Sequence, residues 1–154
     1  HERSYYNPKT SQHEHHRAFV HSFFSGMQLV GDRQNGKIYQ LTQSSNTDDG
    51  ETIVRERITP VVNPTTDRWI FHHLEVTAQV GQESNTKPQI ILDWSDNRGR
   101  TWSYSRQMDL GGIGEYDKRL IFKRLGQSFN RVFRLRFTDA SRLVVLEAKA
   151  KVSQ

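Results

Sequence analysis

A short stretch near the middle of the sequence constrains the fold more than any other feature. Trp94 ends an apolar, strand-like segment, residues 96–99 (Asp-Asn-Arg-Gly) have turn chemistry, and residues 101–102 (Thr-Trp) begin a return strand. This order predicts a β-hairpin. A second turn-like segment follows at residues 111–116. Tight reversals of this kind favour a β structure over a helical one.

The hairpin also matches, with one substitution, the Asp-box pattern Ser-x-Asp-x-Gly-x-Thr-Trp. The matching residues are Ser95, Asn97, Gly99, Thr101 and Trp102, with Asn97 where the pattern usually has Asp. Asp-boxes are structural hairpins of β-rich repeat proteins. The motif therefore predicts architecture rather than catalysis.

Other segments alternate between apolar and polar residues, as half-buried strands do. In residues 132–137, Phe133, Leu135 and Phe137 share one face and Arg134 and Arg136 share the other. In residues 69–80, one face is expected to hold Ile70, His72, Leu74, Val76, Ala78 and Val80. Capped segments with helical spacing are almost absent. Strands about every ten residues predict an all-β fold with an antiparallel β-sandwich, jelly-roll or Ig-like.

The domain organisation is predicted from shifts in composition. Residues 1–43 combine a polar, histidine-rich extended segment with three strand-like runs at 19–24, 26–32 and 37–41. These three runs are typical of one blade of a β-propeller, which cannot bury both of its faces alone. Polar residues 44–52 are expected to form a linker, and residues 53–154 the sandwich domain.

Composition excludes several kinds of protein. Cysteine is absent, so neither a disulfide framework nor a thiolate metal site can form. The apolar runs are too short to span a bilayer, and no signal-peptide layout is visible at the N-terminus. We therefore expect a soluble protein made in a cytoplasm, without membrane insertion. The mean hydropathy of −0.79 is low for a self-sufficient globule, which indicates two-faced strands with much polar surface, a piece of a larger body, or both.

Histidines provide the nearest candidates for a metal site. His13 and His15 would share one face of a strand, with His16 beside them and only Glu14 close in sequence. Because spacing alone does not specify a site, a solvated polar segment is the simpler explanation. No metal or other cofactor is predicted.

Two further groups contain residue types that take part in catalysis. His72 and His73 should lie on opposite faces of one strand, one in the core and one in solvent. Asp93, Asp96 and Asp109 flank the hairpin and could be imagined as a carboxylate pair for glycoside hydrolysis. A turn-forming role explains Asp96 without catalysis. The sequence therefore predicts that the protein is not an enzyme.

Positive charge is concentrated near the C-terminus. Residues 111–154 carry ten Lys/Arg against four Asp/Glu, whereas residues 44–110 carry seven against ten. Such a basic face could bind DNA phosphates or an acidic protein, or it could simply be a solvated strand face. The residues of this possible contact face are Lys118, Arg119, Lys123, Arg124, Arg131, Arg134 and Arg136.

Several segments, in their order and spacing, resemble the closing portion of a known phage family. The segments are residues 30–41, 48–53, 94–103, 111–116, 124–126 and 131–135. The family is the packaged-DNA stabilisation proteins, which are tail hub or nozzle components of short-tailed bacteriophages. The resemblance extends from about Phe19 to the end of the sequence.

The resemblance implies a non-enzymatic structural protein of the virion tail, made in the host cytoplasm. Such hubs form a ring beneath the portal and adaptor, help to retain packaged DNA, and line part of the genome-ejection channel. The implied partners are the adaptor, needle and tailspike proteins and further copies of the chain, with non-specific DNA contact also open. Family members are longer, so this chain would be the C-terminal portion, and residues 1–43 a remnant of the last propeller blade. The alternative suggested by the Asp-box is a carbohydrate-binding or glycan-hydrolysing protein of a phage tail or cell surface.

Overall fold

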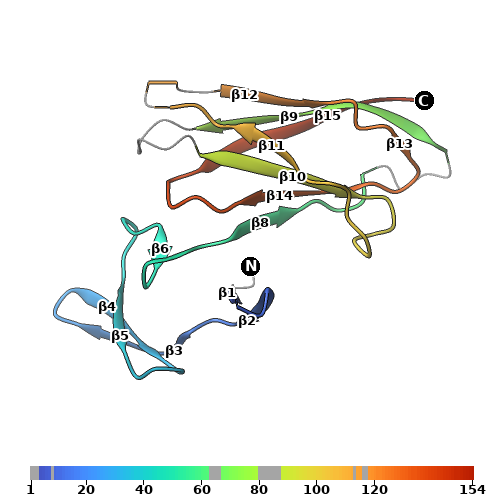
Figure 1. Cartoon of the computed structure of the whole chain (residues 1–154). Coiled ribbons are helices and arrows are strands. Elements are labelled where there is room, and N and C mark those ends of the chain that lie inside the picture. Colours follow the sequence, from blue (N-terminus) through green and yellow to red (C-terminus); the bar gives the residue numbers. More distant parts are fainter. Residues whose placement is uncertain (1–3, 8, 63–66, 80–87, 113, 116–117) are drawn as a thin grey trace. The chain divides into compact units, whose positions relative to one another are not determined.

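The structure, a computed structural model, describes residues 4–7, 9–62, 67–79, 88–112, 114–115 and 118–154. The regular elements of these residues are all β-strands, as the sequence predicts (Figure 1). The chain divides into two compact units, His1–Ile53 and Val54–Gln154. Within the described ranges, no helix has the length and apolarity needed to cross a membrane.

The first unit contains two hairpins and one small sheet. Its strands are β1 (Ser4–Asn7), β2 (Gln12–His15), β3 (Ala18–Phe24), β4 (Met27–Asp32), β5 (Ile38–Leu41), β6 (Thr47–Asp48) and β7 (Glu51–Thr52). The sheet has the order β3-β4-β5, which matches the three strands expected from the sequence. The segment expected to be extended instead contains the β1–β2 hairpin, and the expected linker contains the β6–β7 hairpin.

The β3-β4-β5 sheet leaves large apolar side chains in solvent. Val30 is buried, whereas Phe19, Phe23, Phe24 and Ile38 are each more than 60% exposed. Phe23 shares one face with Val30, while Phe24 and Ile38 lie on the other face by register. Both faces of this sheet therefore carry exposed apolar side chains.

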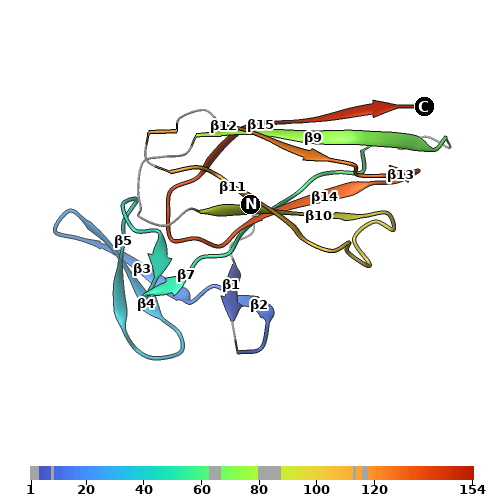
Figure 2. The same cartoon turned by 45° about the horizontal axis from the view of Figure 1, so that its top comes forward.

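The second unit is a sandwich of two antiparallel sheets (Figures 1 and 2). Its strands are β8 (Arg55–Ile58), β9 (Trp69–Gln79), β10 (Gln89–Ser95), β11 (Arg106–Asp109), β12 (Lys118–Lys123), β13 (Gln127–Ser128), β14 (Val132–Phe137) and β15 (Val144–Ser153). One sheet, the β10 sheet, has the order β11-β10-β14-β8. In the other, the β9 sheet, β12 and β13 pair with one edge of β9 and β15 with the other. The predicted β-sandwich is thus confirmed.

The core of the sandwich lies between the inner faces of these two sheets. The alternation of side chains along a strand explains this core, because every second residue of β14 and of β10 points inward. Thus Phe133, Leu135 and Phe137 pair across the sheet with Trp94, Leu92 and Ile90. The buried core cluster is Phe71, Leu74, Val76, Ala78, Ile90, Leu92, Leu110, Leu120, Phe122, Leu125, Phe133, Leu135 and Phe137.

A β-bulge in β9 corrects the face assigned to its first residues. Opposite β15, Phe71 pairs with Val152 and His73 pairs with Lys151, so His72 is the extra residue. The bulge reverses the alternation, which buries Phe71 and leaves Ile70 42% exposed. The expectation that Ile70 and His72 face the core with Leu74 is therefore wrong.

The same bulge determines where both histidines lie. His72 is exposed, and its Nε2 lies 2.8 Å from the hydroxyl of Ser153. His73 is half-buried and lies on the outer face, because its neighbour Leu74 points inward. The predicted core histidine is therefore wrong for both positions. Val80 and part of the predicted 111–116 turn lie outside the described residues.

Candidate functional site

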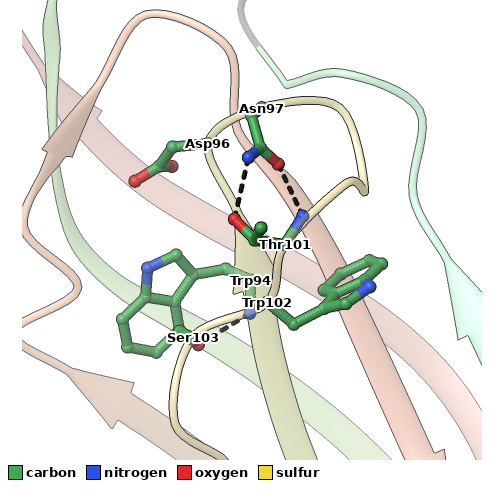
Figure 3. A pocket seen from close by; sticks show the side chains of 6 residues that line it. All are labelled: Trp94, Asp96, Asn97, Thr101, Trp102 and Ser103. Carbon is green, nitrogen blue, oxygen red and sulfur yellow. Dashed lines mark hydrogen bonds between the residues drawn. The ribbon is translucent and has the colours of Figure 1, made fainter.

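The Asp-box hairpin at the end of β10 is held by a compact hydrogen-bond network (Figure 3). The Ser95 hydroxyl donates to Asn97 Oδ1 at 2.8 Å and accepts from the Gly99 amide at 2.8 Å. Asn97 Oδ1 also accepts from the Thr101 amide at 2.9 Å, while Asn97 Nδ2 donates to the Thr101 hydroxyl at 2.7 Å. An amide supplies both an acceptor and a donor. Asn97 therefore replaces the usual Asp without loss of the hairpin.

The return strand starts later than the sequence predicts. The Ser103 amide donates to the Trp94 carbonyl at 2.8 Å, and the Trp94 amide donates to the Ser103 hydroxyl at 3.1 Å. The ladder between β10 and β11 nevertheless begins only at Arg106. Residues 101–105 are a closely held loop rather than a strand.

An open pocket of about 240 Å³ lies beside this loop (Figure 3). An arginine already stacks on each indole at its wall: Arg134 lies 3.9 Å from the Trp102 ring centroid, and Arg106 lies 4.9 Å from that of Trp94. The polar side chains at the wall also have partners within the protein. Asp96 pairs with Arg131, Asn97 bonds to Thr101, and the Ser103 hydroxyl accepts from the Trp94 amide. This arrangement does not favour a sugar-binding site. The lining residues are Trp94, Asp96, Asn97, Thr101, Trp102 and Ser103.

Arg131 is a core residue rather than part of a surface. Its side chain is 2% exposed, and its Nε and Nη2 donate to the two Asp96 oxygens at 2.7 and 2.8 Å. Its Nη1 donates to the Leu125 carbonyl. Arg131 lies two residues before Phe133 and therefore points to the same, inner side of the sheet. Its expected place on an exposed basic face is therefore wrong.

Arg106 makes a similar bridge between the sheets. From the first position of β11, its guanidinium donates to the carbonyls of Lys123 and Arg124, the latter at 3.1 Å. Arg106 and Arg131 both lie within 6 Å of the Trp94 ring centroid. We call Arg106, Arg131 and Trp94 the arginine clamp. It ties the β10 sheet to the chain that leaves β12.

Asp93 organises the outer face of the β10 sheet. Its carboxylate is 1% exposed and lies 3.0 Å from Arg134 Nη2 and 2.7 Å from Arg136 Nη2. It also accepts a hydrogen bond from the Ser105 hydroxyl, and Glu56 lies 3.8 Å from Arg134. Two carboxylates thus neutralise the two arginines that the sequence places on a basic face.

The remaining members of the predicted basic face lie in or directly after β12, in the other sheet. Arg119 pairs with Glu75 through two hydrogen bonds of 2.6 and 2.9 Å, and Lys118 lies 3.6 Å from Glu115. Lys123 and Arg124 are exposed. The seven predicted residues therefore do not form one face of one sheet.

Comparison with known proteins places this geometry in a family. Residues 54–153 match the sequence model of a family described as "Bacteriophage P22 Gp10, beta-sandwich". The chain belongs to this family. The match spans nearly all of the second unit, and it supports a structural protein of a short-tailed phage tail. No curated protein matches the chain.

The candidate metal ligands lie in the first unit, outside the residues matched by the Gp10 family. His13 Nδ1 lies 3.1 Å from the Ser4 hydroxyl, and His16 Nδ1 accepts from the Ala18 amide at 3.1 Å. His15 lines a separate pocket of about 380 Å³ with Glu14, Arg33 and Gln34. Among the residues that the structure describes, no three His, Asp or Glu side chains are placed to hold a metal ion.

The sequence reasoning missed cationic residues of the Gp10-family domain on β15. Lys149 and Lys151 lie beside β9, where their ladder partners are Glu75 and His73. The alternation Glu147-Ala148-Lys149-Ala150-Lys151 was the available signal, because it marks a strand with one charged face.

Proposed function

We propose that this chain is a non-enzymatic hub or nozzle component of a short-tailed phage tail. In this proposal it docks to the portal–adaptor complex, helps to retain packaged DNA, and forms part of the ejection channel. Its proposed partners are the adaptor, needle and tailspike proteins and copies of itself in a ring. The match of residues 54–153 to the Gp10 β-sandwich carries the proposal.

The chemistry of the sandwich supports a scaffold with fixed surfaces. The buried Asp93 and Arg131 each have charged partners within 3.0 Å. Groups held in such pairs are poorly placed to exchange protons or attack a substrate. Non-specific DNA contact through Arg134 and Arg136 stays a prediction, and the pairing of both with Asp93 weighs against it.

The first unit is proposed to be one blade of a propeller. Both faces of the β3-β4-β5 sheet expose large apolar side chains, including Phe23 and Phe24. A three-stranded sheet with two apolar faces needs neighbours on both sides. This favours packing between further sheets of the assembled tail.

Electron microscopy of the full-length protein mixed with purified portal–adaptor complexes tests the proposed function. We expect ring-shaped density beneath the adaptor, and none when portal rings without adaptor are used. A protein that is folded yet never associates with the portal–adaptor complex would contradict the proposal.

A further inference from the structure

Two lysines lie on either side of a histidine across the outer face of the β9 sheet. Lys123 of β12 and Lys151 of β15 are both direct ladder partners of His73 of β9. Directly opposed residues in a sheet point to the same side. That side is the outer one, because Phe122 and Leu74, which neighbour Lys123 and His73, are buried in the core. We call Lys123 and Lys151, which lie on either side of His73, the cation row (Figure 2 shows the three strands together).

The lysines of the row have no acidic partner among the described residues. The carboxylates on the same outer face are Glu75 and Glu147, and each is occupied. Glu75 pairs with Arg119 at 2.6 Å, and Glu147 pairs with Lys149 at 2.8 Å. The row therefore presents two positive charges that no carboxylate of the described residues neutralises.

We propose that the cation row binds carboxylates on an acidic protein surface. This inference rests on the proposed function, in which the chain docks to other tail proteins, and it names one surface that does so. The strands are about 4.8 Å apart, so the two lysines are about 10 Å apart at the backbone. A partner that presents two carboxylates at that spacing would form an ion pair with each lysine at the same time.

The neighbouring charges favour a protein partner over DNA. Glu75 and Glu147 lie on the same face, within about 15 Å of Lys151 along the strands. A duplex carries a phosphate charge about every 1.7 Å of its axis, so its backbone would also lie over these carboxylates. A protein surface can place its own charges to match a mixed pattern.

The experiment uses the full chain and two labelled probes, a polyglutamate peptide and a 20-base-pair duplex DNA, with binding followed by fluorescence anisotropy. The test variant is Lys123→Gln/Lys151→Gln. The matched control is Arg98→Gln/Arg100→Gln, which removes the same charge from two exposed arginines of the hairpin. We expect polyglutamate binding to weaken about fivefold in the test variant, as two exposed ion pairs would give, and to change little in the control.

Three results would overturn the inference. These are no polyglutamate binding by the unmodified chain, equal loss in both variants, and tighter binding to the duplex that is lost in the test variant. A thermal midpoint close to that of the unmodified chain shows that the test variant is folded, because substitutions at exposed positions change stability little. Portal–adaptor docking is measured on the same samples. An unmodified chain that docks without binding polyglutamate refutes the cation row alone, whereas one that never docks refutes the proposed function.

Discussion

Asp93 and Arg131 are both almost completely buried, and each belongs to a different ion-pair network. Arg131 lies between the sheets with Asp96, while Asp93 lies beneath two arginines on the outer face of the β10 sheet. Removing one member of a buried pair leaves its partner without compensation, which costs more than the pair contributes. Single substitutions here should therefore affect stability strongly.

Asp93→Asn keeps the shape of the side chain and removes its charge. We expect it to lower the free energy of unfolding by about 2–3 kcal/mol, because two charge-assisted bonds to Arg134 and Arg136 are weakened. Urea unfolding monitored by tryptophan fluorescence measures the change. Asp67→Asn, at an exposed position, is the control and should stay within about 0.5 kcal/mol. Equal effects of the two substitutions would contradict this account of Asp93.

Asn97 allows a test of the Asp-box hairpin. Asn97→Ala should destabilise the protein by about 1–2 kcal/mol, because it removes the bonds to the Ser95 hydroxyl and to Thr101. Asn97→Asp should stay close to the unmodified protein, since a carboxylate can accept from the same donors. Thermal unfolding of the three proteins compares them directly. An Asp variant as unstable as the Ala variant would show that the amide donor is essential.

Individual residues were harder to predict than the motif that contains them. The Asp-box hairpin could be predicted from eight residues, because its bonds are local. The pairing of Asp93 with Arg134 depends on which strands are neighbours, and the two residues are 41 positions apart. The burial of Arg131 was available from the pattern, because counting back two residues from Phe133 places it on the inner face.

At the scale of an element, β9 shows how one extra residue changes a face. Alternation predicts a strand over residues 69–80, and the structure has Trp69–Gln79. Alternation alone does not reveal the bulge at His72, because a bulge is visible only against the partner strand. The sequence therefore predicts the strand correctly and assigns its first residues to the wrong face.

The bulge makes β9 unusually tolerant of one deletion. Removing His72 would leave Phe71 on the inner face directly before His73, so the core pattern is preserved. Removing Thr77 would instead shift Ala78 to the opposite face. We expect soluble, folded protein from the His72 deletion and none from the Thr77 deletion, as judged by circular dichroism and thermal unfolding. Comparable loss of folding in both would contradict the bulge assignment.

The outer face of the β9 sheet should also respond to acid. Hydrogen bonds from Arg119 hold the pKa of Glu75 below its usual value. A carboxylate with a lowered folded-state pKa stabilises the fold above its unfolded pKa, and this contribution is lost as the pH falls through the folded pKa. The stability advantage over Glu75→Gln should therefore shrink from about pH 5 downwards, since an unfolded Glu titrates near 4.3. Urea unfolding across pH 3–7 measures the difference, and a constant difference would refute it.

For the whole molecule, the two units differ in how well they bury their apolar residues. The second unit has a closed core between two sheets, whereas the first exposes phenylalanines on a three-stranded sheet. The overall fold class could be predicted because turns and alternation recur along the chain. The neighbours proposed for the first unit could not be identified, because the sequence carries no information on their surfaces.

We expect residues 54–154 to fold without the first unit. The fragment should keep the near-ultraviolet circular dichroism of its buried aromatic residues and unfold within a few degrees of the main transition of the full chain. Residues 1–53 alone should instead bind a hydrophobic dye and self-associate, because their apolar side chains are uncovered. A 54–154 fragment without a cooperative transition would show that the units stabilise each other.

The arginine clamp has a consequence for the conditions that the sandwich withstands. In some β-sandwich proteins a disulfide bond joins the two sheets, and a reductant can cleave it. Here, Arg106 and Arg131 make the join by donating to the backbone carbonyls of Lys123, Arg124 and Leu125. A guanidinium keeps its charge at all pH values that proteins experience, and a carbonyl does not titrate. Neither thiol reagents nor moderate acid therefore acts on these bonds, and the two layers should stay joined in both.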